Sequence, residues 1–324
     1  MNFMKNILNI TNGDATVEIM EQAGISGQFL PWRDVLHDGP VPRGVSLEKL
    51  SEIRAAFIIG RDWGEPEAIK RDFVKRDNIL KSYGEYDKVI LWFEHDLYDQ
   101  LQILQILDWF HENKESDVEL SMICRDKYLG MLSPDQMKDL LQYEEVITEK
   151  HLLLSNKSWA AFREPSPTKW HQLLNEDTSV LPYLNGAVVR VLEEYPHCSN
   201  GLSRTAQQAL EIVQKGDNLA SKVFGLNQKA EERVFLGDSS FWCILQELLD
   251  SKPALLKLPE NIQLTIPTAK DQKLTITPAG LEVLSGQQNW LAIANPDRWI
   301  GGVHIEKGNL WCWNPESCSI SKRD

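Results

Sequence analysis

Short unbroken hydrophobic runs alternate with amphipathic stretches over the first 130 residues. Four runs are typical of buried strands: residues 6–10, 27–32, 88–93 and 118–124. Four stretches between them repeat apolar positions at helical spacing: residues 14–23, 47–59, 67–81 and 97–110. The run at 88–93 does not alternate, so we expect both of its faces to be covered, as in a parallel sheet. The pattern predicts an α/β fold with an N-terminal Rossmann-like parallel sheet over residues 1–130.

The rest of the chain has a different pattern. Residues 131–180 are polar and helical, and they contain the proline-rich "REPSPTKW", which suits a connector. Further on, helical patterns cover 181–195, 202–216 and 239–249. Two threonine-rich strands follow within 262–277, then a short helix, and a last hairpin turns near Gly308. Helices followed by a hairpin predict a mostly helical, winged-helix-like domain over residues 181–324.

Composition narrows the class of protein. The 324 residues suit two domains, and 42% hydrophobic with 25% charged residues is typical of a folded soluble chain. No run approaches the roughly 18 apolar residues that a membrane helix needs, and we expect no membrane contact. The five cysteines are scattered without a CxxC pair, which favours reduced thiols and a cytoplasmic location.

Charge argues against broad binding to nucleic acid. The formal net charge is −13, and residues 201–290 carry nine Lys or Arg against ten Asp or Glu. A domain that follows DNA phosphates usually has a basic excess. We therefore expect weak DNA binding by the predicted winged helix, or none.

Charged motifs follow three of the predicted strands. "NGD" follows the first, "RDVLHDGP" the second and "EHDLYDQ" the third. The carboxyl ends of parallel strands share one edge of a sheet, where ligands bind in open α/β folds. We therefore expect these motifs to meet. The chain lacks GxGxxG and GxxxxGK, so a dinucleotide or Walker-type site is not predicted.

These residue types suggest a phosphorylated or nucleotide-like ligand and metal-assisted hydrolysis. The predicted acid/base groups are His37, Glu94 and His95. The predicted metal ligands are Asp38 and Asp96, and a hard divalent cation such as magnesium or manganese suits their oxygens. The predicted ligand contacts are Asn12, Gly13, Asp14, Arg33 and Arg54.

The same residues have purely structural alternatives. Asp96 lies where a helix N-cap belongs, and Asp99 and Asp14 are placed to support helix starts. The arginines could pair with nearby acids such as Asp34, and a lone histidine could simply be packed. Carboxylates that converge within reach of one metal ion would favour the enzyme. Carboxylates that all turn back onto helix N-termini would favour a structural role.

Two parts of the chain resemble a bacterial domain-of-unknown-function family. They are "NITNGDA…PWRDVLHDGPVP…LWFEHDLYDQLQ" and "LTITPAGLEVLSG…RWIGGVHI", so the resemblance covers most of the chain. It implies no reaction, cofactor or substrate. "LTITPAGLEVLSG" is also similar to the wing and following helix of bacterial winged-helix regulators. A second function therefore stays open: a ligand-sensing regulator whose winged helix contacts DNA or protein, without catalysis.

Overall fold

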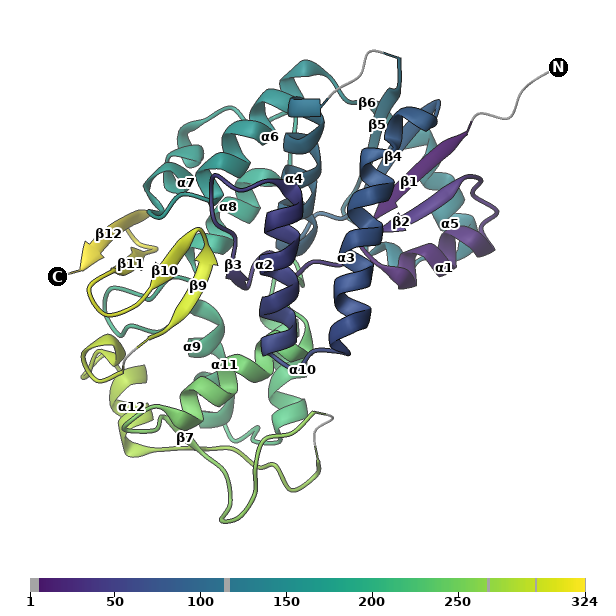
Figure 1. Ribbon diagram of the computed structural model, residues 1–324. Coiled ribbons are helices and arrows are strands. Elements are labelled where there is room, and N and C mark those ends of the chain that lie inside the picture. The colour runs from purple at the N-terminus through teal and green to yellow at the C-terminus, as the bar shows by residue number, and fades with distance from the viewer. Residues whose placement is uncertain (1–5, 114–116, 267–268, 295, 324) are drawn as a thin grey trace.

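The computed structural model describes residues 6–113, 117–266, 269–294 and 296–323 (Figure 1). A five-stranded sheet has the order β2-β1-β4-β5-β6. Its strands are β1 (Ile7–Thr11), β2 (Gln28–Pro31), β4 (Lys88–Phe93), β5 (Glu119–Cys124) and β6 (Glu145–Val146). The first four are mutually parallel, and only β6 runs antiparallel, against β5. The predicted α/β class with a mostly parallel sheet is confirmed.

Both faces of this sheet are covered. Along β4, Val89, Leu91 and Phe93 belong to the large core that also contains the apolar residues of α4 (Leu97–Asn113). The alternate residues Ile90 and Trp92 pack on the other face with α1 (Asp14–Gln22) and α5 (Pro134–Asp139). The burial expected from the unbroken run at 88–93 is thus confirmed.

Helices make up most of the remaining structure. Helices α2 (Leu47–Gly60) and α3 (Pro66–Lys81) pack together, and α6 (Glu149–Phe162) packs along α4. The other α-helices are α7 (Thr168–Gln172), α8 (Leu184–Leu192), α9 (Arg204–Gln214), α10 (Ala220–Ala230), α11 (Asp238–Asp250) and α12 (Pro278–Leu284). Short 3-10 helices are η1 (Tyr83–Glu85), η2 (Leu129–Met131), η3 (Leu140–Tyr143), η4 (Leu173–Asn175) and η5 (Trp290–Ala292). No helix in the described ranges has the length and apolar composition needed to cross a bilayer.

One of the two expected threonine-rich strands is absent from the described residues. Strand β8 (Thr275–Ile276) forms, but it pairs with β7 (Leu256–Lys257) and not with residues 262–266. Side chains take the place of a strand partner there. Gln272 Nε2 donates to the Gln263 carbonyl at 2.9 Å, and Trp242 Nε1 donates to the Thr265 carbonyl at 3.1 Å. The local pattern suited a strand, but distant polar side chains satisfy this backbone instead.

The C-terminal hairpin also differs from the expectation. Strands β9 (Arg298–Gly301) and β10 (Val303–Ile305) form one antiparallel pair, and β11 (Leu310–Asn314) and β12 (Ser319–Arg323) form another. The strand pairing expected for a single hairpin is therefore wrong, although the chain does turn near Gly308, where Glu306 and Asn309 form an isolated bridge. The tight β9–β10 connection needs glycine, because a Cβ on Gly302 would lie 2.0 Å from the Arg163 carbonyl oxygen.

The loop after β2 meets a C-terminal strand in a small sheet. Strand β3 (Gly39–Pro40), from the loop after β2, pairs in parallel with β9. One hydrophobic core also runs from Leu8 in β1 to Trp313 in β11. The division at residues 130 and 180 stays a prediction. The loop after β2 therefore lies beside C-terminal residues.

Candidate functional site

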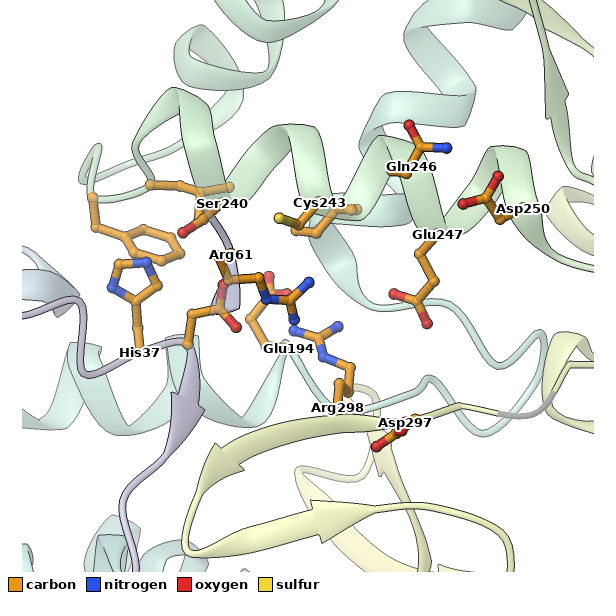
Figure 2. A pocket seen from close by; sticks show the side chains of 14 residues that line it. His37, Arg61, Glu194, Ser240, Cys243, Gln246, Glu247, Asp250, Asp297 and Arg298 are labelled. Atoms are coloured by element: carbon orange, nitrogen blue, oxygen red, sulfur yellow. The ribbon is translucent and has the colours of Figure 1, made fainter. Parts of the chain in front are cut away.

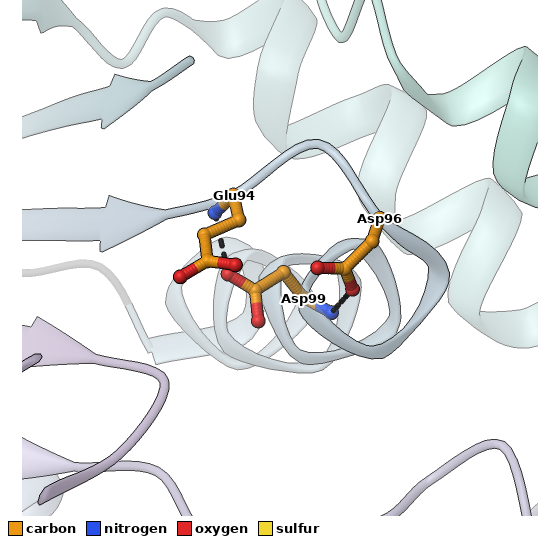
Figure 3. Close-up of side chains that lie close together, drawn as sticks. All are labelled: Glu94, Asp96 and Asp99. Atoms are coloured by element: carbon orange, nitrogen blue, oxygen red, sulfur yellow. Dashed lines mark hydrogen bonds between the residues drawn. The ribbon is translucent and has the colours of Figure 1, made fainter. Parts of the chain in front are cut away.

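Three carboxylates converge at the carboxyl end of β4. Glu94, Asp96 and Asp99 each offer an oxygen, and these oxygens all lie within 4.8 Å of one another (Figure 3). We call these three residues the acidic cluster. Strand β4 ends at Phe93 and α4 begins at Leu97, so the turn between them and the first helical turn bring the three side chains together. Only 6%, 3% and 0% of these residues is exposed.

Hydrogen bonds hold each carboxylate of the cluster in place. Asp96 Oδ1 accepts the Asp99 N–H at 3.1 Å and so caps α4. Asp99 Oδ2 accepts the Glu94 N–H, whereas Asp99 Oδ1 has no partner among the described residues. Glu94 Oε1 accepts the N–H of Leu129 at 2.7 Å. Each carboxylate of the cluster is therefore hydrogen-bonded, and one buried oxygen, Asp99 Oδ1, is left unsatisfied by the described residues.

Asn12 links strand β1 to the cluster. Its side-chain amide donates to Glu94 Oε1 at 2.9 Å and to Asp99 Oδ2 at 3.1 Å. Thr16 Oγ1 donates to Asn12 Oδ1 at 2.8 Å, which turns the amide nitrogen toward the acids. The prediction that motifs after different strands would meet therefore holds for Asn12 and the third motif.

No protein cation neutralises the cluster among the described residues. Burial raises the pKa of Glu94 and, together with repulsion from Glu94, raises the pKa of Asp96 to about 8. Burial and the neighbouring acids raise the pKa of Asp99 well above its usual range. Crowded, buried carboxylates either keep protons at neutral pH or bind a metal ion. An all-oxygen donor set of this kind fits a hard divalent cation.

Both sequence-based alternatives therefore apply to the same residues. Asp96 is a helix cap, and it also lies within metal-ligand reach of two other carboxylates. Asp99 was expected mainly to support the helix, yet it belongs to the cluster. Its position three residues after Asp96, on the first turn of α4, was the signal that could have placed it there.

Two predicted ligand contacts pair with each other instead. Asp14 and Arg33 form an exposed ion pair, with side chains 62% and 46% accessible. This bond lowers the pKa of Asp14. Gly13 precedes α1 in an extended conformation. The described contacts of Asp14 and Arg33 do not bring them to the acidic cluster.

Arg54 is enclosed in a structural ion pair. Its Nε donates to Asp34 Oδ1 at 2.9 Å, and both side chains are fully buried. The guanidinium also donates to the carbonyls of Val35 and Pro40. These bonds hold the loop after β2 in place. They agree with the structural alternative for Arg54, in which the arginine pairs with a nearby acid.

His95 lines a crevice beside the cluster. The crevice has a volume of about 310 Å³, and Leu97, Arg190, Arg204 and Arg233 also line it. Arg190 and Arg204 are paired with glutamates, whereas Arg233 has no carboxylate partner within 4.0 Å in the described chain. Arg233 Nη1 donates to the His95 carbonyl at 3.3 Å. Burial and nearby Arg233 lower the pKa of His95. We call this space the His95 crevice. The sequence did not predict Arg233 as part of it, because Arg233 lies far from His95 along the chain.

His37 and Asp38 line a different cavity, of about 340 Å³ (Figure 2). The ring of His37 lies 6.0 Å from the ring of Tyr98, whose hydroxyl donates to the Asn12 carbonyl at 3.4 Å. Tyr98 thus lies between His37 and the Asn12 side of the cluster. The predicted functional residues do not form one rim. They are divided among the acidic cluster with its crevice, this second cavity, the Asp14–Arg33 pair and the buried Arg54–Asp34 pair.

Comparison with known proteins finds no protein family that matches the chain and no curated protein that matches it. The family resemblance of the "NGDA" and "EHDLYDQ" motifs therefore stays a prediction. Only the chemistry of the described side chains bears on what the protein does.

Proposed function

We propose that the protein binds a divalent cation at the acidic cluster and uses it to hold and hydrolyse a phosphorylated or nucleotide-like ligand. One observation carries the proposal: three buried carboxylates converge within 4.8 Å, and no cationic side chain of the described residues neutralises them. Leaving such charges buried and unpaired is costly. A bound cation removes that cost, and the position at the carboxyl end of β4 suits the ligand crevice of a Rossmann-like sheet.

The residues of the site have different roles in this proposal. Glu94, Asp96 and Asp99 supply oxygen ligands, and Asn12 fixes two of these carboxylates through its amide. A bound magnesium or manganese ion would polarise a phosphoryl oxygen and lower the pKa of a bound water.

The His95 crevice receives the phosphorylated ligand. His95 and Leu97, on either side of Asp96, line it, and Arg233 supplies guanidinium N–H groups for an anion. His95 is neutral at pH 7 because its pKa is lowered, so its ring can accept a proton.

Calorimetric titration with manganese, and separately magnesium, tests the cation site. The variants Asp96→Asn and Asp99→Asn keep the shape of the side chain and its ability to accept a hydrogen bond, and Asn is as good an N-cap as Asp. We expect each to weaken manganese binding at least tenfold while the fold is retained. Asp126→Asn, at an exposed acid, is the matched control and should bind as the wild type does. Equal manganese affinity in all four proteins would refute the site.

Hydrolysis is tested separately, with nucleoside triphosphates and a chromogenic phosphomonoester in the presence of manganese. We expect phosphate release that Asp99→Asn abolishes and that Arg233→Met lowers through a raised KM. Manganese binding without any release of phosphate would leave a binding protein and refute the hydrolase.

The arrangement of α9 to α11 favours a second function, that of a regulator with a winged helix. Three helices are followed by the β7–β8 pair, and a bridge between Leu219 and Lys273 adds a third extended segment. Because local charge is balanced, this unit would contact a protein, or DNA only weakly. Gel shifts with random duplex at low salt test this. Sub-micromolar, salt-dependent binding by the full chain would contradict the expected weakness.

A further inference from the structure

The cavity that His37 lines is a separate place from the acidic cluster. We call it the His37 cavity. Its wall combines the loop after β2, Arg61 directly after α2, helix α11 and the start of β9 (Figure 2). Its volume of about 340 Å³ is at the low end of the range for small-molecule sites. Phe235, Leu236 and Ile244 give it an apolar side.

Side chains of opposite charge line this cavity at distances longer than an ion pair. Arg61 and Arg298 share it with Asp38 and Glu247. Figure 2 shows both guanidinium groups at its centre, with the Glu247 carboxylate projecting toward them from α11. None of these four groups forms an ion pair with another within 4.0 Å in the described chain. Glu194, 3.5 Å from Arg298, is the carboxylate that does pair there.

These charges nevertheless influence one another. Burial raises the pKa of Glu247, and the positive charges of Arg298 and Arg61 act against that rise. Groups of opposite charge that face a common space at more than contact distance can be bridged by a molecule that carries both signs. Such a molecule would make charge-assisted hydrogen bonds at each end.

His37 adds an unsatisfied neutral group. It is 9% exposed, and neither ring nitrogen has a hydrogen-bond partner among the described residues. Burial lowers its pKa to about 4, so at neutral pH the ring offers one donor and one acceptor. Native proteins rarely leave buried polar atoms unpaired, and a bound ligand is one way to satisfy them.

We propose that the His37 cavity binds a small zwitterion. Its acid group accepts hydrogen bonds from Arg61 and Arg298, and its protonated amine donates to Glu247 and Asp38. A neutral polar group of the same molecule faces His37. A simple anion fits less well, because Asp250 and Asp297 also line the cavity and the acids outnumber the arginines. This site does not depend on the proposed cation at the acidic cluster.

Calorimetry with the full chain tests this using free α-amino acids and phosphoethanolamine. Matched derivatives lack one charge each: amino-acid amides lack the acid, and N-acetyl amino acids lack the amine. We expect at least one zwitterion to bind and its single-charge derivatives to bind at least about tenfold more weakly, the effect of losing one charge-assisted hydrogen bond. No binding by any zwitterion, or equal binding by a derivative, overturns the proposal.

Two variants locate the site without threatening the fold. Arg61→Met changes an exposed residue that pairs with no carboxylate in the part of the chain that the structure describes, and Glu247→Gln keeps the side-chain shape. Each should weaken the zwitterion at least about tenfold. Arg71→Met and Glu282→Gln, at exposed positions outside the cavity, are the matched controls and should have no effect. If Arg61→Met and Glu247→Gln bind as the controls do, the cavity is not the site.

Cysteine alkylation reports the same site independently of affinity. Cys243 lines the cavity, whereas Cys318 is exposed and lies outside it. The bound zwitterion should slow alkylation of Cys243 and leave that of Cys318 unchanged, as read by mass spectrometry of peptides. Binding that protects neither cysteine would place the ligand elsewhere and overturn the proposal.

Discussion

Replacing Asp96 by asparagine should make the protein less sensitive to rising pH. In the folded chain the pKa of Asp96 is raised to about 8, from its usual 3.8, because the group is buried beside Glu94. Between these two values the folded state keeps the proton and the unfolded state has lost it. Raising the pH in this range therefore favours unfolding. The stabilising contribution of Asp96 is complete below its pKa in the unfolded chain, and it is lost as the pH rises to its pKa in the folded chain.

Between pH 6.5 and 8, Asp96 changes the free energy of unfolding with pH, whereas His37 does not. The pKa of His37 is lowered from 6.5 to about 4 by burial, so its contribution rises with pH up to 6.5 and is constant above. One retained proton lowers the free energy of unfolding by about 1.4 kcal/mol per pH unit. Over about 1.5 units the loss reaches about 2 kcal/mol. Between pH 6.5 and 8, the free energy of unfolding of Asp96→Asn should therefore rise by about 2 kcal/mol relative to that of the wild type.

Urea unfolding in the presence of a chelator measures this difference, with the exposed Asp126→Asn as the control. The control should follow the wild type at every pH. With saturating manganese the wild type should instead gain stability as the pH rises, because the cation competes with protons for the carboxylates. Equal pH dependence for the wild type and Asp96→Asn in chelator would refute the raised pKa and the proton-sharing cluster.

Two comparisons of variants test other parts of the structure by chemical denaturation. Arg54→Met leaves the buried Asp34 with only the longer contact to Arg76, at 3.8 Å, and should cost more than about 2 kcal/mol. Arg33→Met, in the exposed pair with Asp14, should cost less than about 1 kcal/mol. Similar costs would contradict the assigned burial. Gly302→Ala places a Cβ against the Arg163 carbonyl and should destabilise by more than about 2 kcal/mol, whereas Gly225→Ala, with open space in α10, should stabilise by about 0.5–1 kcal/mol. A neutral Gly302→Ala would show that the β9 turn is not so closely packed.

Hydrophobic periodicity predicted the helices and strands whose formation depends on residues close together in the sequence. The run at 88–93 coincides with β4, and the helix expected over 47–59 ends within one residue of α2. Of the two strands expected within 262–277, the first does not form over the described residues 262–266, where the side chains of Gln272 and Trp242 bond the backbone instead. The pairing of β3 with β9 had no local signal either, since Gly39 and Pro40 match strand residues close to the other end of the chain.

The residues of the two candidate sites differ in the same way. Glu94, Asp96 and Asp99 come from one short stretch, so helix geometry and the strand end could bring them together from the sequence. Asn12 joins them because β1 and β4 are neighbours in the sheet. The pattern predicts a parallel sheet but not this strand order. The His37 cavity is different. Arg298 reaches it only because β9 pairs with β3, and Glu247 only because α11 packs beside the same loop. A site made by long-range pairing leaves single charges scattered along the sequence, each indistinguishable from a solvated surface residue until the chain has folded.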